Sequence, residues 1–207
     1  MTAVSLSSLA RLAVAALLVR ASSAQQPEMA HLSVTGKAGE LALDFMGHSA
    51  NCSAAWGVQY GTSPDFSGAS FVAAYACTDF TAQEPGPSYA LRALMTGLQR
   101  GTRYYYAAGI EGGRAPFSQI FSFVYDSASL RAGGAQYAVL ADFGYFNSES
   151  LGKLMADTYN GRFDMLLHAG DLAYDLDSEK GDVGDGYFRQ IQPIVSQMPY
   201  MAIPGNQ

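Results

Sequence analysis

Three apolar runs in the C-terminal third of the sequence each end on a side chain that could bind a metal ion. The first run ends on Asp142, the second on Asp171 with Tyr174 three residues later, and the third on Asn206. If these runs are strands of an open parallel sheet, their carboxyl ends meet at one edge, where ligands bind. Carboxylates that converge there repel each other, and a bound cation removes that repulsion. Oxygen ligands that include one phenolate suit a hard divalent or trivalent metal ion rather than a soft one.

Three glycines and one histidine near these strand ends bear on the interpretation as a metal site. Gly144, Gly170 and Gly205 allow tight turns and a close approach of the backbone at the strand ends. An isolated Asp after a strand is most often a turn former or a helix cap, so no single residue establishes a metal site. The repetition at three successive strand ends favours the joint site. We interpret His168, inside the second run, as a histidine of the core or one that supports the ligands from behind.

The elements that would position these side chains alternate as strand, helix, strand, helix, strand. The spacing of apolar residues predicts a helix over residues 147–160, with Asn147 or Ser148 as its N-cap. A second helix is predicted over residues 185–198, with Pro193 at a kink or an end. Fully apolar strands joined by helices indicate a parallel sheet that is covered on both faces.

The residues before this segment predict a different architecture. Seven short runs rich in aromatic and β-branched residues lie between residues 29 and 125, separated by Gly, Ser and Pro. This number of short strands in about a hundred residues is typical of a two-sheet sandwich. Leu98, Gly101 and Tyr104 match the turn in which a tyrosine folds back on its own loop, and Trp56 is expected in the core.

Composition and the N-terminus restrict the function classes. The 207 residues carry a net charge of −6, which gives no support for nucleic-acid binding through clustered Lys and Arg. The apolar run 12–19 follows Arg11 and is too short for a membrane span, which needs about 20 residues. It resembles a secretory signal cleaved between Ala24 and Gln25; a disordered or membrane-associated tail is the alternative. We therefore expect a protein of the secretory pathway, either extracellular or vacuolar.

Two cysteines and one sequon bear on that compartment. Cys52 and Cys77 could pair in an oxidising environment, and two independent buried thiols are an equally good interpretation. Asn51 begins an N-glycosylation sequon with Cys52 at its centre, so we expect poor glycosylation there.

The motifs around the strand ends resemble those of a known family. "ADFG", "GDLAY" and "GNQ" are similar to the first three motifs of the calcineurin-like metallophosphoesterases, and Tyr174 with the preceding fibronectin type III-like segment narrows the resemblance to the purple acid phosphatases. The resemblance implies hydrolysis of phosphate monoesters at a binuclear metal centre. It implies that Asp142 and Tyr174 bind Fe(III), that Asp171 bridges to a second divalent ion (zinc, iron or manganese), and that Asn206 binds the second ion.

The same resemblance gives an expected division of the chain. It comprises a signal peptide over residues 1–24, a fibronectin type III-like N-terminal domain over 28–125 and a partial calcineurin-like phosphoesterase domain over 136–207. Between the two domains, the small residues of 126–135 indicate a linker.

The sequence departs from the family pattern at its end. Gln207 stands where the family has a histidine that contacts the substrate, and glutamine cannot act as an acid near neutral pH. The later histidine segments that complete the family's metal centre are not in this sequence. We therefore expect an incomplete chain of an acid phosphatase whose own activity is doubtful; a noncatalytic secreted binding module is the alternative. The sequence leaves the oligomeric state open.

Overall fold

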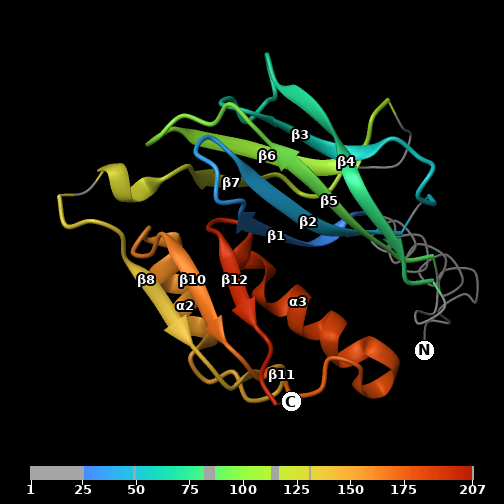
Figure 1. Ribbon diagram of the computed structural model, residues 1–207, viewed down its shortest axis with the longest axis vertical. Coiled ribbons are helices and arrows are strands. Elements are labelled where there is room, and N and C mark those ends of the chain that lie inside the picture. The colour runs from blue at the N-terminus through green and yellow to red at the C-terminus, as the bar shows by residue number, and fades with distance from the viewer. Residues whose placement is uncertain (1–25, 49, 82–86, 113–116, 131, 207) are drawn as a thin grey trace, which may run out of the picture.

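Seven antiparallel strands between residues 28 and 124 form one curled sheet in the computed structural model of the chain (Figure 1). The structure describes residues 26–48, 50–81, 87–112, 117–130 and 132–206. The strands follow the seven runs expected from the sequence and lie side by side in the order β1-β2-β5-β4-β3-β6-β7. Their bounds are β1 (Glu28–Val34), β2 (Leu41–Gly47), β3 (Trp56–Gly61), β4 (Ser70–Asp79), β5 (Tyr89–Met95), β6 (Arg103–Ile110) and β7 (Phe121–Val124).

The sheet curls because β4 belongs to both of its halves. The first half of β4 pairs with β3, where Ala73 lies opposite Gly57, and the second half pairs with β5, where Asp79 lies opposite Tyr89. The register shifts between Ala74 and Ala76, and a bulge of this kind bends a strand and increases its twist. The expectation of two separate sheets is therefore corrected to one continuous sheet whose halves fold over each other.

One hydrophobic core fills the space inside this β lobe (residues 26–125). It joins Leu32 and Leu43 from one half of the sheet to Val58, Tyr106 and Phe123 from the other, all 2% exposed or less. Two local expectations are confirmed at its margin. Trp56 is 2% exposed, and the Gln99 N–H donates a hydrogen bond of 3.0 Å to Tyr104 Oη, so the tyrosine does fold back on its own loop.

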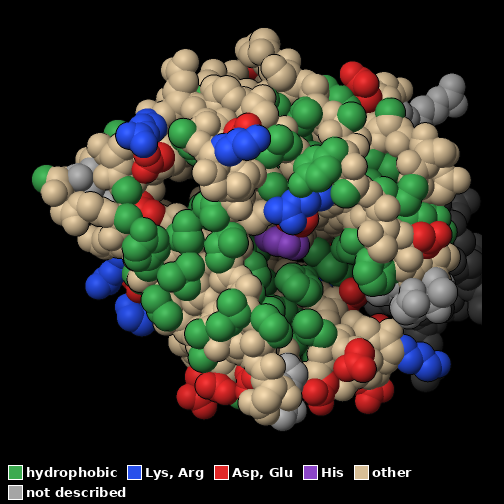
Figure 2. All heavy atoms as spheres, in the orientation of Figure 1, with side chains coloured by type: hydrophobic (Ala, Val, Ile, Leu, Met, Phe, Trp, Pro, Cys, Tyr) green, Lys and Arg blue, Asp and Glu red, His purple; other side chains and the backbone are tan. Residues whose placement is uncertain are grey.

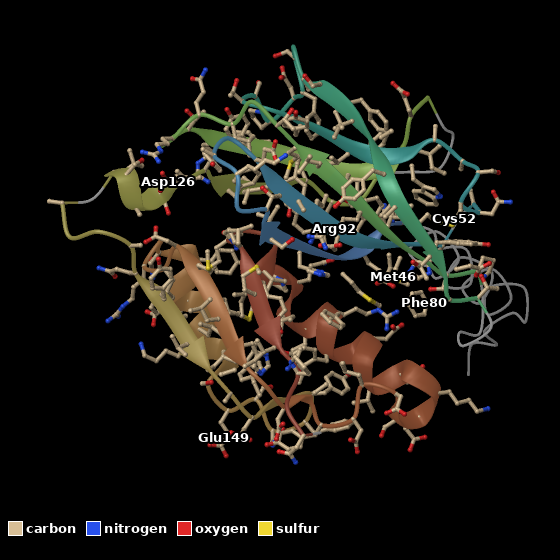
Figure 3. All side chains as sticks on the ribbon, viewed as in Figure 1. Met46, Cys52, Phe80, Arg92, Asp126 and Glu149 are labelled. Atoms are coloured by element: carbon tan, nitrogen blue, oxygen red, sulfur yellow. A yellow bond between two sulfur atoms is a disulfide. The ribbon has the colours of Figure 1, made fainter. Side chains whose placement is uncertain are left out.

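Described residues at both ends of the segment after the β lobe contact neighbouring elements. Residues Ser127–Leu130 form the 3-10 helix η1, and Asp126, labelled in Figure 3, pairs with Arg100 at 2.9 Å. The Ser127 hydroxyl donates to Asp164, which also accepts a hydrogen bond of 2.7 Å from the Gln136 N–H. These contacts attach both ends of the segment to its neighbours.

Residues 132–206 form an α/β lobe around a three-stranded parallel sheet in the order β12-β10-β8. Strand and helix alternate along the chain as expected. Because the neighbouring strands are parallel, each is joined to the next by a crossover connection. A two-stranded parallel ladder, β9 with β11, lies next to the strand ends. The bounds are β8 (Tyr137–Leu140), β9 (Phe143–Gly144), α2 (Leu151–Tyr159), β10 (Met165–Ala169), β11 (Leu172–Ala173), η2 (Ser178–Gly181), α3 (Asp182–Val195) and β12 (Tyr200–Ile203).

Both helices cover the same face of this sheet. Ala138, Leu166 and Tyr200 point to that face and form a core with Tyr187 and Ile191 of α3. The residues that alternate with them are exposed on the opposite face, and Figure 2 shows hydrophobic side chains gathered over β8, β10 and β12 there. They include Tyr137, Val139, Met201 and Ile203, exposed by 53%, 68%, 37% and 60%. The expectation of cover on both faces is therefore wrong for the described residues, because consecutive crossovers of the same hand place both helices on one side.

The first helix begins later than its sequence pattern suggested. Ser150, and neither Asn147 nor Ser148, stands at the N-cap of α2, and it makes no side-chain cap bond. Ser148 is occupied elsewhere, because its Oγ accepts a hydrogen bond of 2.8 Å from Gln190 Nε2 on α3. In α3, Pro193 lies in the last turn, in agreement with the expected position near an end.

The two lobes are joined through α3 and β12. Tyr106 Oη donates a hydrogen bond of 2.8 Å to the Ser196 carbonyl, and the Ala30 N–H donates one of 2.9 Å to Gln192 Oε1. β1 lies beside the start of β12, where Leu32 bridges Pro199. Buried polar contacts of this kind hold the lobes in one arrangement because a broken one leaves an unsatisfied group.

Candidate metal centre

The four predicted ligands lie at one edge of the parallel sheet, which we call the strand-end rim (Asp142, Asp171, Tyr174 and Asn206). Tyr174 Oη donates a hydrogen bond of 2.6 Å to Asp142 Oδ1, and the Asn206 N–H donates one of 2.8 Å to Asp171 Oδ1. The Asp142 N–H donates to the Gly170 carbonyl at 3.3 Å, which links the two pairs. The structure therefore brings together residues that come from three separate strand ends.

The backbone of the rim adopts a conformation that is rare for residues with side chains. The φ angles of Asp142, Asp171 and Tyr174 are 53°, 52° and 55°, and those of Ala173 and Asp175 are 63° and 72°. Left-handed residues of this kind are uncommon outside glycine and persist where the surrounding structure forces them. The short ladder supplies that constraint, because β11 pairs with β9 immediately beside these turns. Clusters of such residues concentrate at functional sites.

Glycines leave the space in which the rim residues approach each other. A Cβ added to Gly205 would overlap Asp171 Oδ1, and one added to Gly170 would lie 2.9 Å from the Gly205 Cα. A Cβ on Gly144 would overlap Asn147 Oδ1 and lie 3.2 Å from the Tyr174 ring. The rim therefore requires glycine next to its acidic residues, as the sequence pattern suggested.

Tyr174 keeps its proton in the absence of a cation. The hydrogen bond to Asp142 raises the pKa of Tyr174 to about 12, and burial and the charges of Asp142 and Asp171 act in the same direction. A neutral phenol then donates to the carboxylate, which holds the two side chains together. A phenolate ligand requires that a cation replace this proton.

The donor types of the rim fit a hard cation. Carboxylate, phenol and amide oxygens are the ligand types that iron(III) and small divalent ions accept. Within the part of the chain that the structure describes, no group of three or more His, Cys, Asp or Glu side chains is arranged to hold a metal ion. The rim depends instead on a tyrosine and an asparagine beside its two carboxylates.

His168 lies behind the rim, as a member of the core. It is 2% exposed, and its Nδ1 lies 2.9 Å from Tyr200 Oη and 3.0 Å from Tyr187 Oη. Burial lowers the pKa of His168, against the smaller opposing effects of Asp142 and Asp171. The imidazole of His168 is therefore neutral, with the hydroxyls of Tyr187 and Tyr200 both next to its Nδ1. In this position it packs behind the rim and supports β10.

The remaining predicted residues lie elsewhere. Cys52, labelled in Figure 3, is joined to Cys77 by a disulfide with a Cα–Cα distance of 5.7 Å, in agreement with the interpretation in which the two cysteines pair. Asn51 is exposed, and its Oδ1 accepts a hydrogen bond of 3.0 Å from the Ser53 N–H. Gln207 lies outside the described residues, as does the expected signal segment 1–24.

Two features between the lobes escaped the sequence analysis. One is a cleft of about 830 Å³ between the β lobe and the start of α3, lined by Met46, Phe80 and Arg92 among others (Figure 3). The other is a charged cluster in which Arg189 contacts Glu28 across 161 positions of sequence. Local patterns carry no signal for contacts between residues so far apart.

Comparison with known proteins identifies the β lobe. Residues 27–125 match the family model described as "Purple acid Phosphatase, N-terminal domain". The chain is 37% identical over 118 residues to acid phosphatase type 7 of Danio rerio and 37% identical over 121 residues to that of Mus musculus. Each alignment covers 57% of this chain and 26% of the relative, so the chain spans about a quarter of their length.

A solved structure supports the same assignment at the level of the fold. A purple acid phosphatase from yellow lupin (Lupinus luteus) seeds superposes with a TM-score of 0.71 at 20% identity, over 88% of this chain and 35% of that one. At this identity the similarity concerns the fold alone. Residues 27–125 therefore match the purple acid phosphatase N-terminal domain, and the chain is similar to acid phosphatases in sequence over 57% of its length and to a purple acid phosphatase in fold.

Proposed function

We propose that the strand-end rim is part of the metal centre of an acid phosphatase-type hydrolase that acts on phosphate monoesters. The observation that carries this proposal is the 2.6 Å contact between Tyr174 Oη and Asp142 Oδ1, at an edge that also holds Asp171 and Asn206. The relatedness to acid phosphatases supports the substrate class. In this proposal the α/β lobe is the first part of a metallophosphoesterase domain.

The ligand assignment is the one that the resemblance to the purple acid phosphatases implies, and the oxygen donors of the rim are compatible with it. Asp142 and Tyr174 would hold Fe(III), Asp171 would contribute to both Fe(III) and a second divalent ion (zinc, iron or manganese), and Asn206 would hold that second ion. Bound ions of this kind neutralise a phosphate ester and stabilise charge on the attacking and leaving oxygens. Four protein ligands, one of them shared, are too few to saturate two ions, so we expect the 207 residues alone to turn over substrate far more slowly than a full-length relative.

The chain's own residues prepare the site before a cation arrives. The hydrogen bond from Tyr174 to Asp142 holds a phenol and a carboxylate oxygen 2.6 Å apart. The backbone N–H of Asn206 holds one oxygen of Asp171 in place. Tyr174 would have to lose its phenol proton to serve as a metal ligand, so binding of a cation would weaken as the pH falls.

Titration of the purified protein with Fe(III), followed by calorimetry and visible absorption, tests the proposal. We expect Asp142→Asn to bind at least about tenfold more weakly, the loss that follows even when only a supporting residue is removed. Glu149→Gln is the matched control: Glu149, labelled in Figure 3, is an exposed acid of the same lobe outside the rim. Equal binding by all three proteins would refute the assignment.

One observation favours a second candidate function, a noncatalytic secreted binding module. The family match covers residues 27–125, which form the β lobe and contain none of the four rim residues. Absence of Fe(III) binding by the unmodified protein would support this candidate over the first.

A location in the secretory pathway, extracellular or vacuolar, belongs to both candidate functions. The disulfide between Cys52 and Cys77 supports it, because such bonds persist in oxidising compartments. No helix in the described part of the chain has the length and apolar character that crossing a membrane requires. N-terminal sequencing of secreted protein tests the location, and we expect a mature chain that starts at Gln25. A secreted chain that starts at Met1 would refute cleavage of the signal.

A further inference from the structure

Three elements meet at one charged cluster on the interface between the lobes. Glu28, at the start of β1, accepts hydrogen bonds of 2.9 Å from Arg189 Nε and 2.8 Å from Arg189 Nη2 on α3. His48, just after β2, has its Nε2 3.1 Å from Glu28 Oε1. Asp185, one turn before Arg189 on the same helix, accepts a hydrogen bond of 2.7 Å from Arg189 Nη2.

The geometry around His48 favours its charged form. Nε2 faces the Glu28 carboxylate, and Nδ1 lies 3.3 Å from the Pro87 carbonyl and 3.4 Å from Ser88 Oγ. The Glu28 carboxylate accepts its hydrogen bonds from Arg189 and attracts the nearby Nε2 by charge rather than through an aligned hydrogen bond, whereas the Pro87 carbonyl can only accept from an Nδ1 that carries a proton. The His48 side chain is 15% exposed, so water cannot easily replace either partner.

We propose that Glu28, His48 and Arg189 form an acid-dependent clamp that fastens α3 of the α/β lobe to the β lobe. Glu28 receives one cation from each side: Arg189 from the α/β lobe at every physiological pH, and His48 from its own lobe only when the imidazole is protonated. Protonation of His48 holds Glu28 in the position that Arg189 requires. Asp185 also accepts a hydrogen bond from Arg189 and therefore competes with Glu28 for its positive charge. The charge of protonated His48 then contributes more to holding Glu28 in place.

The electrostatics of both partners give the pH range of the clamp. The close contact with Glu28 raises the pKa of His48 above 6.5, although burial and the charge of Arg189 oppose it. Burial would raise the pKa of Glu28, but the contacts with His48 and Arg189 outweigh burial and lower it to about 2. The His48 contribution is complete below its unfolded pKa of 6.5 and is lost as the pH rises through the higher folded value. The Glu28 contribution is complete above its unfolded pKa of 4.5 and is lost as the pH falls toward about 2.

The clamp is therefore fully formed between pH 4.5 and 6.5, the interval bounded by the two unfolded pKa values. This inference does not depend on the metal centre, because Glu28, His48 and Arg189 are not rim residues. It predicts a protein whose lobes are held most firmly in a mildly acidic compartment.

The Ala30 amide provides a direct reporter of lobe contact, because it donates to Gln192 Oε1 of α3 across the interface at 2.9 Å. Hydrogen exchange at this amide, corrected for the intrinsic effect of pH, is compared at about pH 5.5 and about pH 8. We expect protection of the unmodified protein to fall severalfold at the higher pH. In His48→Gln we expect low protection at both values, and in His48→Lys, which keeps a cation at both values, no fall.

Asp65→Asn is the control, since Asp65 is an ionisable residue of the same lobe that contacts Ser63 and Ser67 on an exposed turn and takes no part in the clamp. It should keep the fall in protection seen with the unmodified protein. An NMR titration of the His48 ring adds a measurement that does not depend on any folding defect of a variant. We expect its midpoint above about 6.5 in the unmodified protein and lower in Glu28→Gln. A midpoint at or below about 6.5, or a His48→Gln protein that keeps the full pH dependence at Ala30, would overturn the clamp.

Discussion

Tyr174 Oη donates a hydrogen bond of 2.6 Å to Asp142 Oδ1, although the two residues are 32 positions apart in the chain. The contact joins the end of the first parallel strand to the turn after the second. It keeps the phenol protonated, since the carboxylate raises the pKa of Tyr174 to about 12. The pair is therefore a hydrogen-bonded unit that only a cation of high charge should separate.

Replacement of Tyr174 should remove the visible absorption band of bound Fe(III) without abolishing Fe(III) binding. With Fe(III) bound, Tyr174→Phe should lose the visible absorption band, because no phenolate is left to transfer charge, while Asp142 and Asp171 still hold some metal. Absorption spectra with matched metal analysis make the measurement. Tyr159→Phe is the control, because Tyr159 is 65% exposed at the end of α2. An unchanged band in Tyr174→Phe would mean that another residue provides the chromophore.

Two glycine substitutions should differ in their effects: Gly205→Ala should weaken Fe(III) binding, and Gly152→Ala should stabilise the protein. Gly205→Ala places a Cβ on Asp171 Oδ1, so we expect it to displace the carboxylate and to weaken Fe(III) binding by at least about tenfold. Gly152→Ala meets nothing within 4 Å and lies in α2, so it should stabilise the protein by about 0.5–1 kcal/mol and leave binding unchanged. Calorimetric titration and chemical unfolding measure the two effects. Unimpaired binding by Gly205→Ala would show that the rim can relax.

The two faces of the parallel sheet should respond differently to truncation. Leu166, 2% exposed in β10, packs in the core, and Leu166→Ala should lower the free energy of unfolding by about 2–5 kcal/mol. Val139, 68% exposed in the neighbouring β8, faces away from both helices, and Val139→Ala should change it by less than about 0.5 kcal/mol. Denaturant unfolding measures both values. A loss of several kcal/mol in Val139→Ala would mean that another surface covers this face in solution.

The disulfide should stabilise the β lobe chiefly through the unfolded chain. Cys52 and Cys77 are 25 positions apart, and closure of a loop of this size contributes about 3 kcal/mol. We expect the double variant Cys52→Ala, Cys77→Ala to unfold at correspondingly lower denaturant concentration. Mass spectrometry under non-reducing conditions first establishes that the bond is present. Two thiols that alkylate freely without reduction would contradict the pairing.

Much of the architecture is encoded in local patterns. The seven β-lobe strands follow runs of aromatic and β-branched residues, and the tyrosine at position 104 folds back because its turn is specified within six residues. The positions of Asp142, Asp171 and Asn206 at strand ends are also local, since each directly follows the apolar run that forms its strand. Parallel strands then place their carboxyl ends at one edge, so neighbourhood in space follows from order in sequence.

The tertiary structure decided what depends on distant partners. The pairing of β4 with both β3 and β5 joins the two halves into one sheet, and the common side of both crossovers leaves Val139 exposed, although both features are invisible in the hydrophobic pattern. The left-handed turns at Asp142 and Asp171 require the β9–β11 ladder, which holds them against their own backbone preference. The contact of Glu28 with Arg189 spans 161 positions, and it exists only because β1 packs against α3. Sequence periodicity determines which face of a helix or strand is buried. Packing alone determines which other elements that face contacts and which partners the charged residues beside it find.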